Sequence, residues 1–266
     1  MKDFFRPLKL HDRRMAKIMV RLKIIQLVLL VAVASPANAE PGNVSAGTGF
    51  FYNSDGHLFT NRHVIADCRP NSIRVRTHDQ NWHEARILAM DSRVDIAALA
   101  INKEVEAFAS FRLFAGTNSV SVPNEMEDAF SAGFSSPEAN KFKLQYKWGQ
   151  IQPWKDPNKF PYVHRMRMDA YPGASGSPIL DYAGLLIGIV FASSVAPAPD
   201  YDNLRSVGYG DKWIFIYNNN ALLVFANQHG LRYNAWGKWE RKDPMFIAGH
   251  ADRITALILC ENAIEK

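Results

Sequence analysis

Between about residue 45 and residue 217 the chain alternates short apolar segments with turn residues, a pattern typical of β-strands. Residues 49–52 and 57–61 flank the turn Asn53-Ser-Asp-Gly56 and predict a hairpin. Similar segments recur and predict further strands at 72–77, 82–90, 95–101, 129–134, 142–151, 162–169, 178–180, 185–191 and 212–217. Many short strands at this spacing favour barrels or a sandwich, so the pattern predicts an all-β fold.

The expected strands form two groups, separated by residues 102–123, which carry few periodic signals. We expect one lobe at about 45–115 and a second at about 124–217. Helical patterning is confined to the end of the chain, where Asn218 or Asn219 caps a helix over 218–229 and Gly230 stops it.

The remaining residues, 230–266, form a C-terminal tail. Ile254, Leu257, Ile258 and Ile264 lie at helical spacing and predict a helix over 251–264. Trp236 and Trp239 are expected to pack the tail against the body, with an exposed partner site as the alternative.

Residues 1–39 have the pattern of an export signal. Eight basic side chains precede or flank an apolar run over 24–34, and Ala37-Asn-Ala39 is a small-x-small cleavage pattern. An uncleaved anchor is the alternative, but about 17 apolar residues are needed to cross a bilayer. We therefore expect an exported protein, periplasmic or secreted, with no stable membrane span after cleavage at Glu40.

Charge does not indicate a polyanionic partner. Residues 1–39 hold 8 basic and 2 acidic side chains, a net of +6, against +5 for the whole chain, so the rest carries about −1. The pI of 9.1 reflects the leader, and no nucleic acid partner is expected. The 227 residues after the leader suffice for two medium lobes.

The chain has two cysteines, Cys68 and Cys260. Export would allow a disulfide closing a loop of 192 residues, worth about 5 kcal/mol in the chain-entropy model. Two unpaired buried thiols are the alternative. No metal or other cofactor is expected, because two distant cysteines make no zinc motif.

Gly173-Ala-Ser175-Gly-Ser-Pro178 has the features of a nucleophile turn. A serine hydroxyl needs a base to take its proton, and the oxyanion that forms needs donors fixed in advance. A glycine two residues before the serine lets the backbone turn tightly, so that the amides of Gly173 and Ser175 can point at one spot. By itself, the hexapeptide could equally be an ordinary turn.

Two further segments favour catalysis. His63 follows a strand end in Thr60-Asn-Arg-His63, which places an imidazole at the edge of a lobe. Asp95 precedes the apolar run 96–101, and a carboxylate there needs a hydrogen-bond donor such as the Nδ1 proton of His63. Asp91 is the second candidate for this role.

Together with Gly47-Thr-Gly-Phe50 and Gly188-Ile-Val190, these motifs resemble the trypsin-like serine peptidases, especially the bacterial HtrA/Deg type. The Ser-Gly-Ser-Pro ending is also similar to glutamyl endopeptidases, where serine replaces the usual second glycine. The likeness covers about residues 45–229 and implies two perpendicular six-stranded antiparallel β-barrels with C-terminal helices, which places a peptidase domain at 40–229.

The resemblance implies a serine endopeptidase acting on proteins or peptides. Ser175 would be the nucleophile, His63 the general base and Asp95 its orienter, while the amides of Gly173 and Ser175 would form the oxyanion hole. Asp169, six residues before Ser175, would either line the pocket for a Lys or Arg side chain or be structural. Phe191, Ala192 and Ser193 would form a pocket wall, and Val190 does not support a preference for Glu.

The chain departs from the family pattern in two places. Chymotrypsin-type zymogens carry Asp directly before the nucleophile to pair with a new N-terminus, but Ala174 has no charge, which excludes that activation. HtrA enzymes usually continue into a PDZ domain, and the 37 residues after residue 229 are too few for one.

Two other readings compete with an active peptidase. Ser175 with Asp200 or Asp202 and His229 or His250 has the chain order of α/β-hydrolases, but their elbow needs Gly-x-Ser-x-Gly and a following helix, whereas Pro178 opens a strand. A protease-fold binding protein with an inactive site is the non-enzymatic alternative. The natural substrate and the oligomeric state are not readable from the sequence.

Overall fold

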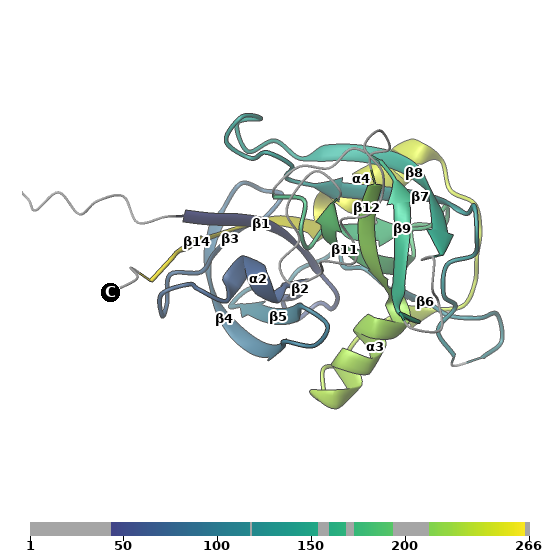
Figure 1. Ribbon diagram of the computed structural model, residues 1–266, viewed down its shortest axis with the longest axis horizontal. Helices are drawn as coiled ribbons and strands as arrows, with labels where there is room; N and C mark the ends of the chain where they lie inside the picture. The colour runs from purple at the N-terminus through teal and green to yellow at the C-terminus, as the bar shows by residue number, and fades with distance from the viewer. Residues whose placement is uncertain (1–43, 118, 154–159, 169–172, 194–212, 264–266) are drawn as a thin grey trace, which may run out of the picture. The chain divides into compact units, whose positions relative to one another are not determined.

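The computed structural model describes residues 44–117, 119–153, 160–168, 173–193 and 213–263. All of these lie in one compact unit, Gly42–Lys266. The expected leader, residues 1–39, lies outside the described residues. Strands dominate the unit (Figure 1).

The first barrel is closed and has six strands in the order β1-β14-β3-β4-β5-β2. Every neighbouring pair in it is antiparallel. Its strands are β1 (Val44–Phe51), β2 (His57–Asn61), β3 (Arg74–Arg76), β4 (Trp82–Asp91), β5 (Ile96–Ile101) and β14 (Thr255–Glu261).

The second barrel also closes with six antiparallel strands, β10-β7-β8-β9-β12-β11, because β10 pairs with β11 as well as with β7. Its strands are β7 (Asp128–Gly133), β8 (Gln145–Pro153), β9 (Val163–Arg167), β10 (Pro178–Leu180), β11 (Leu186–Ser193) and β12 (Trp213–Asn218). The prediction of two six-stranded antiparallel barrels is confirmed.

Two short strands extend the second sheet. β6 (Phe111–Arg112), in the segment between the barrels, pairs in parallel with β11, and β13 (Ala235–Trp236), in the C-terminal tail, pairs in parallel with β6. The linking segment and the tail therefore lie together along one edge of the second barrel.

Strand β5 is buried on both of its faces. In β5, Ala97 and Leu99 face the core of the first barrel, whereas Ile96 and Ala98 face a second cluster that includes Phe130 of β7. Successive side chains of a strand point to opposite faces, so a strand buried on both faces reads as a continuous apolar run. This explains why residues 96–101 lack polar positions.

The predicted helix after the second barrel is confirmed as α3 (Asn219–Gln228). The Asn218 side chain caps it by accepting from the backbone N–H groups of Asn220 and Ala221 at 3.1 and 3.2 Å. Gly230, just beyond its end, has a φ of 63°, the left-handed conformation that glycine adopts readily.

The prediction of a helix over 251–264 is wrong in position. The tail helix is α4 (Pro244–Ile254), capped by Asp243, and the chain continues directly as β14. Residues 255–258 are all buried, and such a run cannot be assigned to helix or strand by periodicity alone.

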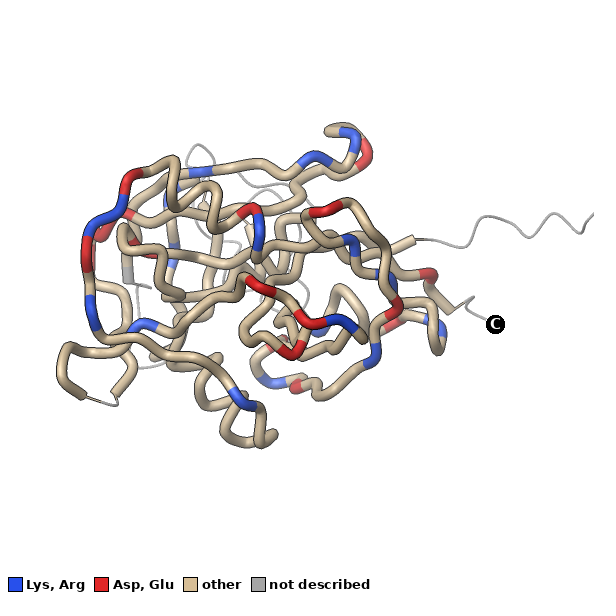
Figure 2. Tube along the Cα trace, turned by 180° about the vertical axis from the view of Figure 1, so that it is seen from behind, with Lys and Arg blue, Asp and Glu red and all other residues tan. Residues whose placement is uncertain are grey.

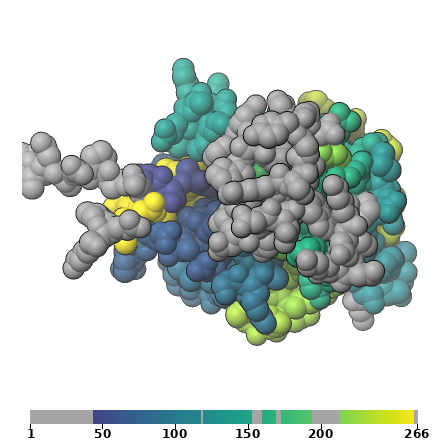
Figure 3. Space-filling view, viewed as in Figure 1, coloured from purple at the N-terminus to yellow at the C-terminus, as the bar shows by residue number. Residues whose placement is uncertain are grey.

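Strand β14 inserts between the first described strand and β3. It pairs with β1 from Val44 opposite Glu261 to Phe50 opposite Thr255. The two strands run side by side in the ribbon and in the space-filling view, where purple and yellow meet (Figures 1 and 3). A disulfide between Cys68 and Cys260, whose Cα atoms are 5.5 Å apart, fixes this arrangement.

The two tail tryptophans differ. Trp239 packs as expected, with its ring 5.2 Å from the guanidinium carbon of Arg112 and its Nε1–H donating to the Leu113 carbonyl at 2.9 Å. Trp236 remains 56% exposed, so the expectation that it packs against the body is wrong.

Basic and acidic positions are interspersed along the described trace (Figure 2). Among the described helices, none has the length and apolar character needed to cross a membrane.

Candidate active site

A histidine that follows β2 and an aspartate that precedes β5 meet at one end of the first barrel. β2 ends at Asn61, and the short helix α2 (Arg62–Ile65) follows with His63 in its first turn. Pairing of β2 with β5 places Asn61 opposite Ile96, directly beside Asp95. Asp95 Oδ2 lies 2.6 Å from Nδ1 of His63, and Asp95 Oδ1 accepts the backbone N–H of His63 at 2.9 Å.

The backbone of Asp95 also holds the start of α2. Its carbonyl accepts from the N–H of Arg62 at 3.1 Å and from the side-chain amide of Asn61 at 3.0 Å. Asp95 has a φ of 44°, a left-handed conformation that aspartate tolerates better than most residues. Asp95 therefore fixes both the helix turn and the imidazole that the turn carries.

Asp91, the second candidate for the orienting carboxylate, has another partner. Its oxygens accept from the backbone N–H, Nε and a terminal nitrogen of Arg93, the last at 2.7 Å. Hydrogen bonding from Arg93 lowers the pKa of Asp91. The carboxylate in contact with His63 is that of Asp95.

Ser175 lies in a turn between two glycines with positive φ, 96° at Gly173 and 87° at Gly176. A Cβ at Gly173 would lie 2.3 Å from the Phe134 carbonyl oxygen, and one at Gly176 would lie 1.9 Å from that of Thr48. Any side chain at either position would collide with backbone, so this turn requires glycine at both positions.

Both barrels hold the serine turn. The Gly176 N–H donates to the Val190 carbonyl of β11 at 2.9 Å, and the Ser175 carbonyl accepts from the Thr48 N–H of β1, also at 2.9 Å. Ser175 itself is partly exposed. The turn is thus attached to β11 on one side and to β1 on the other.

The segment Gly47–Thr48 connects the serine to the histidine. A Cβ at Gly47 would lie 2.5 Å from Cγ1 of Val64, the residue after His63, while the next residue, Thr48, binds Ser175. His63 and Ser175 therefore flank the same segment of β1. Within the described part of the chain, the Ser175 hydroxyl makes no hydrogen bond to the imidazole, so the predicted proton relay stays a prediction.

The amides of Gly173 and Ser175 are the groups predicted to bind an oxyanion. Among the described residues, no group accepts a hydrogen bond from the N–H of Gly173 or Ser175. In the same part of the chain, no three His, Cys, Asp or Glu side chains are arranged to hold a metal ion.

The predicted substrate-binding residues are only partly described. Asp169 lies outside the described residues. Phe191 is 3% exposed and stacks on Tyr217 with ring centroids 4.1 Å apart, so its ring belongs to the core. Ser193 is 8% exposed, and Ala192 is the more accessible residue of the predicted wall.

Sequence reasoning missed three buried hydroxyls that surround the turn, those of Thr48, Thr60 and Ser177. Thr60 Oγ1 donates to the Thr48 carbonyl at 2.8 Å, and Ser177 Oγ donates to the Ala174 carbonyl at 2.6 Å. Their signal was present in the motifs themselves, because Thr48 lies between two glycines and Ser177 occupies a usual glycine position.

Two closed antiparallel barrels, with an aspartate–histidine pair on the first and a glycine-flanked serine just before β10 of the second, define the trypsin-like fold. The chain matches the trypsin-like peptidase domain family over residues 47–189. It belongs to that family, as its motifs predict.

Relatives of several kinds match the chain. It is 26% identical over 235 residues to the uncharacterized protein y4bJ of Sinorhizobium fredii, which covers 86% of this chain and 35% of the relative. It is 30% identical over 146 residues to a probable periplasmic serine endoprotease, DegP-like, of Pseudomonas fluorescens, covering 54% and 29%. The chain thus spans about a third of the length of the relatives it matches.

Solved structures show the same fold. The active form of the Rv3671c protease from M. tuberculosis has a TM-score of 0.50 and 20% identity, covering 80% of this chain and 91% of that chain. The serine endoprotease from Yersinia pestis has a TM-score of 0.50 and 19% identity, covering 71% and 62%.

Proposed function

We propose that this chain is an exported serine endopeptidase that hydrolyses peptide bonds through an acyl-enzyme on Ser175. The observation that carries the proposal is the 2.6 Å contact between Asp95 Oδ2 and His63 Nδ1. Ser175 lies in a turn that requires glycine at positions 173 and 176. Membership of the trypsin-like peptidase family supports the same chemistry.

His63 would work as a base because of its hydrogen bond to Asp95. With the carboxylate of Asp95 accepting from Nδ1, that nitrogen carries the proton and Nε2 is left as the acceptor. Nε2 would take the Ser175 proton as Oγ attacks the scissile carbonyl, and Asp95 would stabilise the imidazolium. The N–H groups of Gly173 and Ser175 would bind the oxyanion.

The remaining steps follow from the same groups. The imidazolium returns its proton to the leaving amine as the C–N bond breaks, which leaves an ester on Ser175. Water then attacks this ester while His63 takes its proton, the ester C–O bond breaks to release the carboxylic acid product, and His63 gives the proton to Ser175 Oγ. The Ser175–His63 hydrogen bond, which the structure does not make, would form as substrate binds, since such contacts tighten in the complex.

Export rests on three supporting observations. Residues 1–39 have the pattern of a cleavable leader. The Cys68–Cys260 disulfide suits an oxidising compartment. Some relatives are named as periplasmic endoproteases.

Proteins or peptides would be the substrates, with Ala192 and the backbone of 191–193 forming part of the binding wall. For Asp169 we retain both roles, a pocket for Lys or Arg and a scaffolding role. Cleavage of a peptide library distinguishes them, since a preference for small apolar residues would assign Asp169 to the scaffold.

A fluorophosphonate probe tests the enzyme directly, because it reacts with an activated serine. We expect the parent to be labelled and to cleave casein, and Ser175→Ala to do neither while keeping the parent's circular dichroism. A Ser131→Ala variant, which removes another buried hydroxyl of the second barrel, serves as the matched control and should behave as the parent. A parent that resists labelling would favour the protease-fold binding protein instead.

A further inference from the structure

Oxyanion donors contribute to catalysis only if they are oriented before the reaction begins. In this chain the residue before the nucleophile is Ala174, which is 5% exposed and packs in the core of the second barrel with Ile179 and Val190. It has no charge with which to hold the turn. Some other part of the structure must therefore orient the amides of Gly173 and Ser175.

Ser177 holds the peptide group that carries the Ser175 amide. Its Oγ donates to the Ala174 carbonyl at 2.6 Å, and its backbone N–H donates to the same carbonyl at 3.0 Å. The peptide between Ala174 and Ser175 is planar and trans, so its C=O and N–H point in opposite directions. Fixing the carbonyl toward Ser177 turns the Ser175 N–H away from it, where it has no partner among the described residues.

The hydroxyl of Ser177 fits a space that another glycine provides. A Cβ at Gly133, the last residue of β7, would lie 1.9 Å from Ser177 Oγ. Ser177 is 1% exposed, so bulk solvent does not reach its hydroxyl. The absence of a side chain at Gly133 therefore allows the hydroxyl to reach the Ala174 carbonyl.

Thr48 holds the carbonyls on either side. Its Oγ1 donates to the Gly173 carbonyl at 2.8 Å and accepts from the Phe134 N–H at 3.0 Å, while its backbone N–H donates to the Ser175 carbonyl. Its side chain is fully buried. Three consecutive carbonyls, those of Gly173, Ala174 and Ser175, are thus each bonded to Thr48 or Ser177.

We propose that the hydroxyls of Thr48 and Ser177 are positioning residues that orient the oxyanion-binding amides. This inference rests on the proposed peptidase function. The two hydroxyls touch neither the substrate nor the reacting atoms, and they act through the peptide groups that they hold. They take the place of an ion pair at the residue before the nucleophile.

The test compares four variants that fold as judged by circular dichroism and thermal melting. Ser177→Ala and Thr48→Val each remove one hydroxyl, Thr48→Ser keeps it, and Ser131→Ala is the matched control. Ser131 Oγ is also buried and donates to a backbone carbonyl, that of Pro178 at 3.0 Å, but Pro178 is already the first residue of β10 and Ser131 makes no hydrogen bond to the carbonyls of residues 173–175.

Kinetics on a peptide amide separate positioning from stability. We expect Ser177→Ala and Thr48→Val to lower kcat by about 10- to 100-fold with KM changed less than about threefold, since removal of a donor itself costs about 10²–10³. Affinity for a peptide boronic acid, which forms a tetrahedral adduct, should fall in parallel, and affinity for a product peptide should not. Thr48→Ser should restore the parent values, and Ser131→Ala should keep them.

A kcat and boronic acid affinity for Ser177→Ala within twofold of Ser131→Ala would overturn the proposal. If the parent fails to react with the fluorophosphonate probe, the proposed function fails. Crystal structures of the parent and of Ser177→Ala then test the positioning role by itself. An Ala174 carbonyl that turns away from position 177 in Ser177→Ala supports the positioning role. A carbonyl that keeps its orientation in that variant overturns it.

Discussion

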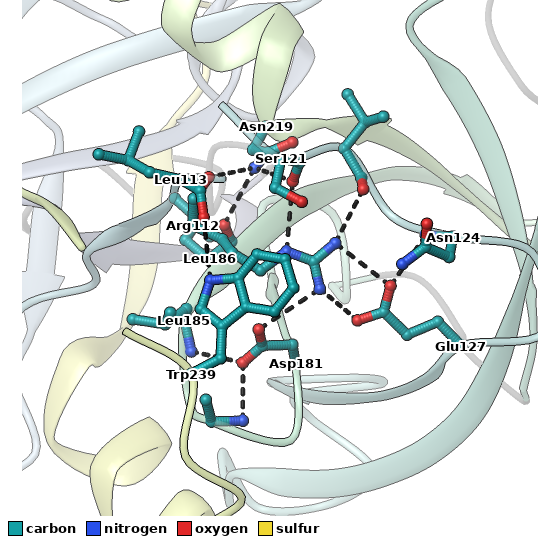
Figure 4. Close-up of polar contacts among 12 residues, drawn as sticks. Arg112, Leu113, Ser121, Asn124, Glu127, Asp181, Leu185, Leu186, Asn219 and Trp239 are labelled. Atoms are coloured by element: carbon teal, nitrogen blue, oxygen red, sulfur yellow. Dashed lines mark hydrogen bonds and ion pairs between the residues drawn. The ribbon is translucent and has the colours of Figure 1, made fainter. Parts of the chain in front are cut away.

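Arg112 is the largest fully buried side chain of the described residues, and we predict that its replacement by methionine sharply destabilises the fold. Its guanidinium donates to both carboxylate oxygens of Glu127, lies 3.4 Å from Asp181 Oδ2, and donates to the Val122 carbonyl at 2.8 Å (Figure 4). The exposed fractions are 1% for Arg112, 8% for Glu127 and 1% for Asp181. Removal of the cation therefore leaves two buried carboxylates without it.

Breaking a buried ion pair by removing one partner costs about 3–5 kcal/mol. We expect the loss of unfolding free energy in Arg112→Met to lie at the upper end of this range, because two carboxylates share one cation. Burial already disfavours the charged form of Asp181 and raises its pKa. For a unit of this size, the same loss corresponds to a fall in Tm of roughly 6–20 °C. It would remove a third or more of a typical total stability of about 5–15 kcal/mol.

Urea unfolding followed by tryptophan fluorescence measures the loss. Arg232→Met is the matched control, since Arg232 also binds a carboxylate, that of Asp55 at 2.7 Å, but the two side chains are 84% and 41% exposed and the loss should cost under about 1 kcal/mol. The triple variant Arg112→Met, Glu127→Gln, Asp181→Asn should recover part of the stability, because no buried charge remains uncompensated. Equal losses in Arg112→Met and Arg232→Met would refute the argument from burial.

Three further predictions concern the disulfide and the two aspartates. Replacing Cys68 and Cys260 by alanine should lower the free energy of unfolding by up to about 5 kcal/mol, measured in urea, and a variant as stable as the parent would show that the loop closure contributes nothing. Asp95→Asn should lower kcat by about 10⁴ through the wrong imidazole tautomer, whereas Asp91→Asn should leave kcat unchanged; equal effects would contradict the assignment of Asp95. Because the pKa of Asp91 lies below its ordinary 3.8 in the fold, Asp91 stabilises the protein above that pH and less as the pH falls through its folded value. Stability curves of Asp91→Asn and parent should therefore differ at neutral pH and converge in acid, and a constant gap would exclude this linkage.

Local sequence rules predicted most of the strands correctly. Turn residues mark the hairpin between β1 and β2, the alternation of Ile73 and Val75 marks β3, and Asn218 marks the start of α3. These signals arise from neighbours in sequence, and the physical preferences of turns and caps act over the same short range. The positions of His63, Asp95 and Ser175 at strand ends follow from the same rules.

The role of the tail could not be predicted in this way. Whether residues 255–261 form a helix or a strand is decided by β1 and β3, which lie far away in sequence and provide the hydrogen bonds of β14. Arg112 was not foreseen for a similar reason, since its partners come from residues 121–127, from Asp181 and from Trp239. Such clusters depend on tertiary contacts that no local pattern encodes.

The position of β14 ties the end of the chain to the candidate site. β1 carries Thr48, which holds the serine turn, and β1 pairs with β14 at seven residues but with β2 at only two. Thr48 itself lies opposite Leu257. The backbone that orients Ser175 is therefore held in the first barrel mainly by the C-terminal strand, and the disulfide at Cys260 holds that strand in place. It follows that the tail is an integral part of the fold that supports the site.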